Sequence, residues 1–176
     1  DGSGLTTRLT SYGRDGNDTI TGGSNRDTLR GDAGNDVITG GDGADNITGG
    51  AGADELRGDA GNDRLYADAQ DTVVDGGAGT DRVDVQGADG INLDMTGGSI
   101  EQAFGNVGND TLDASGSSAR ITAYGRDGND TISGGDDRDN LRGDAGDDVI
   151  SGGGGADQLI GGAGADELRG GAGNDR

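Results

Sequence analysis

Large aliphatic residues recur at every ninth position along two long stretches of the chain. In the first stretch these positions hold Ile20, Leu29, Ile38, Ile47, Leu56, Leu65, Val74 and Val83. The residues on either side are mostly polar, which favours a short β-strand with the aliphatic side chain inward and its two neighbours outward. The six residues between strands are rich in Gly, which favours turns with left-handed backbone angles. We therefore expect three-residue strands, such as 19–21 and 28–30, to alternate with six-residue turns.

Two strand–turn units make one coil of 18 residues, so aliphatic residues 18 positions apart are expected to line one wall of a solenoid. One wall would hold Ile20, Ile38, Leu56 and Val74, and the facing wall Leu29, Ile47, Leu65 and Val83. Coils that follow one another in this way stack as parallel strands. The pattern predicts an all-β fold, a parallel β-solenoid with 18 residues per coil.

The nine-residue period divides the chain into two regular runs. The first run covers residues 1–84, with nonapeptides from Gly13, and the second covers residues 105–176 and stops within a repeat. Residues 85–104 lose the period. Because the chain also starts without Met, we expect it to be a piece of a longer protein.

The irregular stretch still contains two short segments of alternating polarity, 91–95 and 99–104. A longer repeat includes it, because residues 1–64 align without gaps to residues 113–176 at an offset of 112. Since 112 is not a multiple of nine, the irregular stretch belongs to this longer unit. We expect it to continue the solenoid in altered form rather than to act as a flexible linker.

The composition excludes several kinds of site. The chain has 42 Gly, no Cys and no His, so it lacks disulfides, thiolate ligands and the commonest transition-metal ligand. A net charge of −21 argues against binding nucleic acid, and no apolar stretch is long enough to span a membrane. With 28% hydrophobic residues, composition alone favours disorder, but a disordered chain has no reason to keep Asp and Ile in fixed phase.

An aspartate occupies the sixth position of almost every repeat, when the repeat is numbered from its first glycine and the aliphatic residue is eighth. These aspartates are Asp18, Asp27, Asp36, Asp45, Asp54, Asp63, Asp81, Asp110, Asp130, Asp139, Asp148, Asp157, Asp166 and Asp175. Aspartates 18 residues apart, such as Asp18 and Asp36 or Asp27 and Asp45, are expected to stack between turns whose carbonyls point toward neighbouring coils. Such oxygens suit Ca²⁺, whereas Mg²⁺ demands a tighter octahedron.

The pattern therefore predicts Ca²⁺ between stacked turns, about nine ions in all. The glycines expected to line these sites are Gly31, Gly34, Gly40, Gly43, Gly49, Gly52, Gly143, Gly146, Gly152 and Gly155. No segment fits an EF-hand, and the chain has no Lys for a phosphate-binding Walker loop. The outward arginines Arg30, Arg57, Arg64, Arg142 and Arg169 are expected to offset local negative charge.

A few positions depart from the repeat. The sixth position holds Thr7, Thr72 and Ala119 in three turns, and the sites beside these turns are not expected to be complete. Asn25 and Asp137 replace a turn glycine. Because Asn and Asp tolerate left-handed backbone angles better than other side chains, we expect these two residues to adopt them.

The motif G-G-x-G-x-D-x-U-x, with U a large aliphatic residue, resembles the RTX (repeats-in-toxin) or hemolysin-type calcium-binding repeat; residues 31–39, GDAGNDVIT, are one copy. The resemblance covers most of the chain outside residues 85–104. It implies a right-handed parallel β-roll with Ca²⁺ between successive turns, held by the aspartates and the carbonyls of preceding residues. It also implies secretion by a type I system and folding outside the cell.

The resemblance implies a calcium-binding module of a larger secreted bacterial protein, located outside the cell or at the cell surface. The module is expected to fold on binding Ca²⁺ and to serve as a folding switch, spacer or stabiliser. Its expected partners are Ca²⁺, the rest of the parent polypeptide and the type I secretion machinery. We do not expect an enzyme, because the chain lacks His, Cys, a G-x-S-x-G elbow and a zinc motif. The alternatives are a repeat segment of a surface adhesin or matrix protein, and an accessory domain of a secreted protease or lipase.

Overall fold

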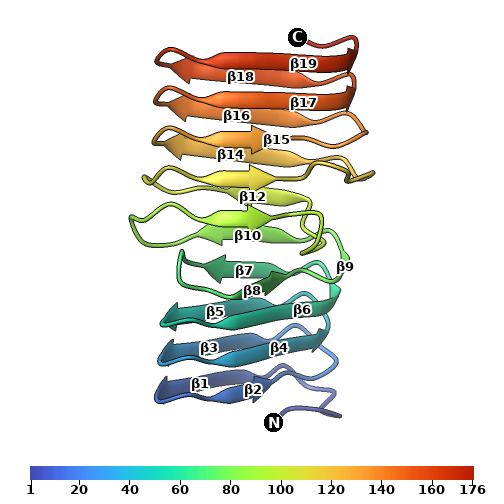
Figure 1. Cartoon of the computed structure of the whole chain (residues 1–176). Coiled ribbons are helices and arrows are strands. Elements are labelled where there is room, and N and C mark those ends of the chain that lie inside the picture. The colour runs from blue at the N-terminus through green and yellow to red at the C-terminus, as the bar shows by residue number, and fades with distance from the viewer. The chain divides into compact units, whose positions relative to one another are not determined.

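The computed structural model describes residues 1–176 and consists of β-strands joined by turns and loops. By their internal contacts the residues form two compact units, 1–84 with 98–100, and 85–97 with 101–176. Within each unit parallel strands stack coil upon coil (Figure 1), so the predicted all-β solenoid is confirmed. No helix in the structure is long and apolar enough to cross a membrane.

The first unit, 1–84 with 98–100, has two parallel sheets whose strands alternate along the chain. One sheet holds, in order, β1 (Thr10–Asp15), β3 (Thr28–Ala33), β5 (Asn46–Ala51), β7 (Arg64–Ala67) and β10 (Arg82–Val85). The other holds β2 (Thr19–Thr21), β4 (Val37–Asp42), β6 (Glu55–Gly61) and β8 (Val73–Asp75), with β9 (Ala78–Gly79) also paired to β6. Two strands and two turns therefore complete one coil.

The second unit, 85–97 with 101–176, repeats this arrangement. One set of neighbouring strands is β12 (Gln102–Phe104), β14 (Thr122–Asp127), β16 (Asn140–Ala145) and β18 (Gln158–Ala163). The other is β11 (Asn92–Asp94), β13 (Thr111–Asp113), β15 (Thr131–Ser133), β17 (Val149–Gly155) and β19 (Glu167–Gly173). Each alternating segment of the irregular stretch thus supplies one strand, β11 or β12, which pairs in parallel with β13 or β14.

The core is two walls of aliphatic side chains facing each other inside each coil. The strand register places Ile20 beside Ile38 on one wall and Leu29 beside Ile47 on the other, as the 18-residue spacing predicts. Ile38, Ile47 and Leu65 are all 0% exposed. Each repeat contributes only one such side chain, worth about 1.5–3 kcal/mol when buried, so the core is thin.

The strands extend further into the turns than the sequence predicts. β3, β4 and β5 are six residues long, and in the pairing of β4 with β6 Gly41 lies opposite Asp59 and Asp42 opposite Ala60. The prediction of three-residue strands with six-residue turns is wrong for these coils, because stacked turn backbones pair with one another as well. Gly40 and Gly58 are skipped by this ladder.

The five arginines predicted to offset negative charge all form ion pairs. The pairs are Arg30–Asp32, Arg57–Glu55, Arg64–Asp84, Arg142–Asp144 and Arg169–Glu167. Most of these side chains are exposed to solvent, where an ion pair contributes about 0–1 kcal/mol. The arginines therefore balance local charge more than they hold the fold together.

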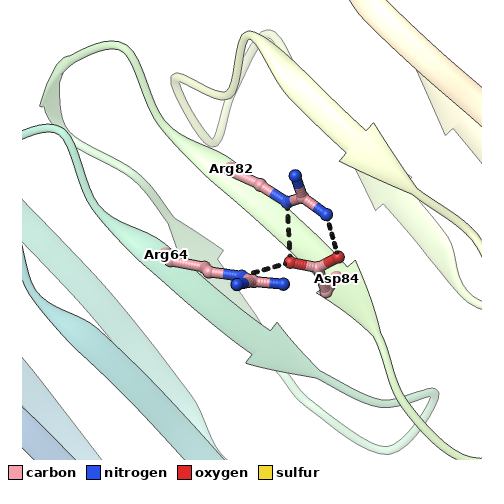
Figure 2. A network of polar contacts seen from close by, with 3 residues as sticks. All are labelled: Arg64, Arg82 and Asp84. Carbon is pink, nitrogen blue, oxygen red and sulfur yellow. Dashed lines mark hydrogen bonds and ion pairs between the residues drawn. The ribbon is translucent and has the colours of Figure 1, made fainter.

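The pair at Asp84 is different because this aspartate is only 5% exposed. Figure 2 shows its carboxylate between two guanidinium groups: Arg82 donates at 2.8 and 2.6 Å, and Arg64 at 2.6 Å. Burial acts to raise the pKa of Asp84, but the hydrogen bonds and charges of Arg82 and Arg64 outweigh it and lower the pKa overall. The guanidinium of Arg64 also lies 4.8 Å from the ring centre of Tyr66. The cluster links β7 to β10 without a metal ion.

Replacing Asp84 by Asn is expected to lower the free energy of unfolding of the folded chain by about 1–3 kcal/mol, because two guanidinium groups lose their charged acceptor. Both arginines are partly exposed, which keeps the loss below that of a fully buried pair. Urea denaturation of the two proteins measures the difference. Glu167→Gln, in an exposed pair, is the control and should change the free energy by less than about 1 kcal/mol. Equal losses in both variants would contradict a special role for Asp84.

Candidate metal centre

The sixth-position aspartates point into the interior at the turns. Each stands two residues before an inward aliphatic residue, and residues two apart on an extended strand face the same side. Asp36, Asp45 and Asp54 are accordingly no more than 1% exposed, and Asp63 is 2% exposed. The local strand geometry that builds the core therefore also buries a column of carboxylates on each side of the coil.

From Asp27 onward, one carboxylate oxygen of each sixth-position aspartate bonds to the preceding coil. Oδ1 of Asp36 accepts a hydrogen bond from the backbone N–H of Asp18 at 2.7 Å, and Oδ1 of Asp54 accepts one from Asp36 at 2.8 Å. The same bond from the preceding coil reaches Asp27, Asp45, Asp63, Asp81, Asp110, Asp130, Asp139, Asp148, Asp157, Asp166 and Asp175. Aspartates of successive turns are thus stacked, and each carboxylate caps a backbone amide.

The second carboxylate oxygen, Oδ2, is buried and has no hydrogen-bond partner in many of these turns. This is so for Asp18, Asp36, Asp45, Asp54, Asp63, Asp130, Asp148 and Asp157. A buried, ionised oxygen without a partner costs several kcal/mol, so it must be met by a cation or a proton. The need for a cation or a proton at Oδ2 therefore recurs at the sixth position of the turn in successive coils.

A backbone carbonyl points to the same place as this oxygen. A Cβ atom added to Gly40 would lie 2.5 Å from Oδ2 of Asp45 and 2.6 Å from the carbonyl oxygen of Gly58 in the next coil. The same convergence of carboxylate and carbonyl occurs at Gly13, Gly22, Gly31, Gly58, Gly105, Gly134 and Gly152. The missing side chain of the first glycine therefore leaves a space lined by oxygens from two successive coils.

These oxygens match the preference of a hard divalent cation such as Ca²⁺ for carboxylate and carbonyl ligands. The structure has no cluster of three or more acidic side chains that could hold a metal ion. The converging oxygens come instead from one carboxylate and from the backbone. The space beside the first glycine is thus suited to a cation that accepts mixed oxygen ligands.

A model of one known protein family matches the chain repeatedly. The family is the RTX calcium-binding nonapeptide repeat (4 copies), and the matches cover residues 12–47, 39–74, 48–83, 57–90, 95–118, 124–159 and 151–176. The chain belongs to the RTX family. RTX repeats bind calcium, and they form a structural repeat with no assigned chemistry of their own. No curated protein matches the chain.

The glycines of the RTX repeat have two different roles. Gly31, Gly40, Gly49, Gly143 and Gly152 are first glycines, where a Cβ would meet the aspartate Oδ2. Gly34, Gly43, Gly52, Gly146 and Gly155 are fourth residues, with φ between 117° and 138°. Such angles are accessible almost only to Gly. The first glycines leave room beside the carboxylate, and the fourth glycines shape the turn.

The expectation that Asn25 and Asp137 adopt left-handed angles is wrong, because neither has a positive φ. Left-handed non-Gly residues occur instead at the second position of the repeat. These are Arg14, Asp32, Asp59, Arg126 and Asp144, with φ between 70° and 83°. Angles near 80° are strained but possible for a residue with a side chain, whereas the larger angles of the fourth position exclude Asn and Asp.

Three predicted ligands have both carboxylate oxygens bonded to the backbone. Their Oδ2 atoms accept a hydrogen bond from the N–H of the second residue of their own turn. The pairs are Gly23 with Asp27 at 2.6 Å, Asn106 with Asp110 at 2.9 Å, and Gly135 with Asp139 at 2.8 Å. These carboxylates therefore do not present the unpartnered oxygen found in the other turns.

The degenerate repeat at Thr72 keeps an acidic cap through a residue that the sequence pattern missed. Oδ1 of Asp71 accepts from the N–H of Asp54 at 3.2 Å, and its Oδ2 accepts from Asp68 at 2.9 Å. The Thr72 hydroxyl donates to the carbonyl of Asp54 at 3.1 Å. Burial raises the pKa of Asp71 to about 7. The only signal in the sequence was an aspartate displaced by one position.

Burial raises the pKa of the stacked aspartates toward neutrality. It raises the pKa of Asp63 to about 6 and that of Asp130 to about 7, and carboxylates of adjacent coils add to the effect, partly opposed by the hydrogen bond from the preceding coil. The pKa is raised, first by burial, for Asp45, Asp54, Asp110, Asp139 and Asp148. Near neutral pH the columns therefore favour a bound proton or cation.

Protons are expected to compete with calcium for the folded chain, so that the calcium concentration for half-saturation is higher at pH 5.5 than at pH 8. In the metal-free fold Asp63 and Asp130 keep protons up to about pH 6–7, whereas an unfolded chain loses them near pH 4. The metal-free fold therefore loses stability as the pH rises from about 4 to about 7. Below about pH 7 calcium must displace protons from these carboxylates. Calorimetry in buffers of different ionisation enthalpy measures the half-saturation and the protons released. A half-saturation that does not change with pH would contradict the expectation.

Proposed function

We propose that the chain is a calcium-dependent folding module of a larger secreted bacterial protein, in which it acts as a folding switch, spacer or stabiliser. The observation that carries this proposal is the column of buried Oδ2 atoms without a hydrogen-bond partner. Without a cation each of these oxygens opposes the folded state, and with one it holds two coils together. Membership of the RTX family names calcium as the cation.

The proposed ligands are the Oδ2 atom of an aspartate and the carbonyl oxygen of the first glycine of the next coil, as at Asp45 and Gly58. Asp18, Asp36, Asp54, Asp63, Asp130, Asp148 and Asp157 have the same unpartnered oxygen. Asp81, Asp166 and Asp175 remain predicted ligands on the strength of their position in the repeat. A count of about nine ions also remains a prediction.

The module is proposed to consist of two calcium-binding runs, 1–84 and 105–176, joined by a stretch, 85–104, that binds no calcium. In support, the stretch contributes two strands but has no aspartate at the sixth position of a nonapeptide. Its side chains Ile91, Leu93, Met95 and Ile100 are buried, so it keeps a core while losing the metal column.

Secretion through a type I system follows from the resemblance to RTX proteins and is part of the proposal. A calcium affinity of about 10⁻⁴–10⁻³ M, typical of extracellular modules, would suit a chain that stays unfolded where calcium is scarce and folds once outside the cell. The partners proposed are Ca²⁺, the secretion machinery and the remainder of the parent polypeptide.

A second candidate is a repeat segment of a surface adhesin or matrix protein. The observation that favours it is the long repeat, in which residues 1–64 align with 113–176. Tandem copies of such a unit are typical of extended surface proteins. An accessory role beside the catalytic domain of a secreted protease or lipase is the other candidate, and the sequence that flanks this chain in the parent protein distinguishes the two.

Equilibrium dialysis tests the proposed binding directly. At millimolar calcium the chain is expected to bind several ions, and an equal concentration of Mg²⁺ should displace few of them, since Mg²⁺ needs a tighter octahedral site. Binding of no calcium at this concentration, or equal binding of Mg²⁺, would overturn the proposal.

A further inference from the structure

The turns that carry a sixth-position aspartate occur in two backbone conformations. In three turns, here called closed, neither the second nor the fourth residue has a positive φ; they are residues 22–27, 105–110 and 134–139. In every other such turn, here called open, both residues have a positive φ, as with 96° at Gly41 and 131° at Gly43. The closed turns are those of Asp27, Asp110 and Asp139.

The two conformations differ in what the peptide between the first and second residues of the turn contacts. In the open turn 58–63 the carbonyl oxygen of Gly58 points toward the space beside Gly40. In the closed turn 22–27 the N–H of Gly23 donates to Oδ2 of Asp27, in the space that the carbonyl oxygen of Gly40 also lines. Because the peptide is planar and trans, an inward N–H places its own carbonyl on the other side.

The inward amide satisfies the carboxylate of a closed turn. It occupies an oxygen that has no partner in open turns such as those of Asp45, Asp130 and Asp157, and it brings the partial positive charge of its hydrogen to the space where a cation would lie. In each closed turn, Oδ1 of the aspartate accepts from the backbone N–H of an aliphatic residue in the preceding coil, not from that of another aspartate. These residues are Leu9, Ile91 and Ile121. Each closed turn therefore begins a column of aspartates.

Specific side chains account for the closed conformation. In open turns the fourth residue is always Gly, with φ between 117° and 150°, which other residues cannot readily adopt. Asn25 and Asp137 hold this position in two of the closed turns. In the third, the buried side chain of Asn106 donates to the carbonyls of Gln86 and Asp89 at 3.1 and 2.8 Å, and it accepts from Gly108 at 2.6 Å.

We propose that the closed turns are metal-independent ends of the aspartate columns: their carboxylates bind no calcium, because the amide of the same turn takes the place of the cation. The residues Asn25, Asn106 and Asp137 keep these turns closed. The inference rests on the proposed function, in which open turns bind calcium. It makes Asp27, Asp110 and Asp139 structural caps, although their place in the repeat is the same as that of the proposed ligands.

Matched substitutions test the metal claim. Each closed-turn variant is compared with the same substitution at the next aspartate of its column. The pairs are Asp27→Asn with Asp45→Asn, Asp110→Asn with Asp130→Asn, and Asp139→Asn with Asp157→Asn. The number of calcium ions bound at saturation is measured by native mass spectrometry. Closed-turn variants should bind as many ions as the unmodified chain, and each open-turn variant at least one fewer.

The outcomes separate the two proposals. Loss of an ion in a closed-turn variant, equal to that of its match, would overturn the inference alone. If neither member of any pair changed the count, the proposed open-turn ligands would be wrong. In the calcium-loaded, unmodified chain, coupling across the hydrogen bond between the Gly23 amide nitrogen and the Asp27 side-chain carboxyl carbon should be observed by NMR. Its absence would contradict the closed geometry without reliance on any variant.

A change at the fourth position tests the determinant. Gly43→Asn should close turn 40–45 and remove at least one bound ion while every aspartate is retained, whereas the control Asn25→Asp should leave the count unchanged. Asn25→Gly should open turn 22–27 and add one bound ion. This second variant tests the fourth position even if Gly43→Asn does not fold. An unchanged count in Gly43→Asn, or in Asn25→Gly, would overturn the role given to the fourth residue.

Discussion

Removal of calcium with EDTA is expected to convert the β-roll into a largely unfolded chain. Each nonapeptide buries one large aliphatic side chain, and this must offset the ordering of nine residues that include several conformationally free glycines. The columns of buried carboxylates oppose the fold further, since eight of the aspartates have an Oδ2 atom with no partner, among them Asp36, Asp45 and Asp148. Metal binding and folding should therefore be one event.

Far-ultraviolet circular dichroism and the hydrodynamic radius measure this change. In EDTA the strand signal should fall to that of an unfolded chain and the radius should increase, and both should return when calcium is added in excess. Magnesium at the same concentration and ionic strength is the control and should restore little of either signal. Full strand content in EDTA would contradict the prediction.

At the calcium concentration that half-folds the unmodified chain, Gly40→Ala is expected to lower the ratio of folded to unfolded chain by about 5- to 150-fold. The added methyl group would lie 2.5 Å from Oδ2 of Asp45 and 2.6 Å from the carbonyl oxygen of Gly58, where it both clashes and fills the space between them. Such overpacking costs about 1–3 kcal/mol, which corresponds to that change in an equilibrium.

Gly154→Ala is the matched control for this substitution. Gly154 is also a turn glycine, but an added Cβ there meets nothing closer than 3.5 Å, and its φ is not in the left-handed region. At the same calcium concentration the ratio of folded to unfolded chain should change by only about twofold, as for a surface substitution within ±0.5 kcal/mol. Equal effects of the two substitutions would show that the space beside Gly40 has no special role.

The sequence allows the fold and the columns to be predicted because both follow from fixed spacing. Residues 18 apart must stack in a solenoid with two repeats per coil, so Ile20 pairs with Ile38 and Asp18 lies next to Asp36. The fixed spacing does not determine which backbone group a carboxylate meets. It therefore missed the bond from each amide to Oδ1 of the next aspartate, which ties successive coils together before any ion is considered.

The closed turns show most clearly where spacing alone is insufficient. The repeat gives Asp27 and Asp45 the same position, yet their surroundings differ because the peptide before Gly23 presents its N–H to the interior. The sequence contains the signal, Asn25 in place of a glycine, but its meaning depends on the φ that the stacked turn requires. The natural interpretation, that Asn would tolerate the left-handed angle, led to the wrong conformation.

A further set of contacts is visible only in the structure. Asparagines at the fifth position of the repeat accept from the backbone of the next coil: Oδ1 of Asn17 accepts from the N–H of Asn35 at 2.9 Å, and Oδ1 of Asn35 accepts from Ala53 at 3.0 Å. Asn129 and Asp147 form the same bond at 2.8 Å. This ladder explains why Asn so often precedes the aspartate, and it needs no metal ion.

A calcium titration that records binding and strand formation on the same sample shows whether the β-roll forms only with its calcium ions. Calorimetry gives the number of ions bound, and circular dichroism gives the fraction of strand formed at each calcium concentration. If the buried carboxylates make the fold depend on calcium, the two curves should coincide, starting from an unfolded chain and ending in the β-roll with several ions bound. Strand content that is complete before calcium is added, or calcium binding that saturates without a change in strand content, would show that the fold does not depend on calcium.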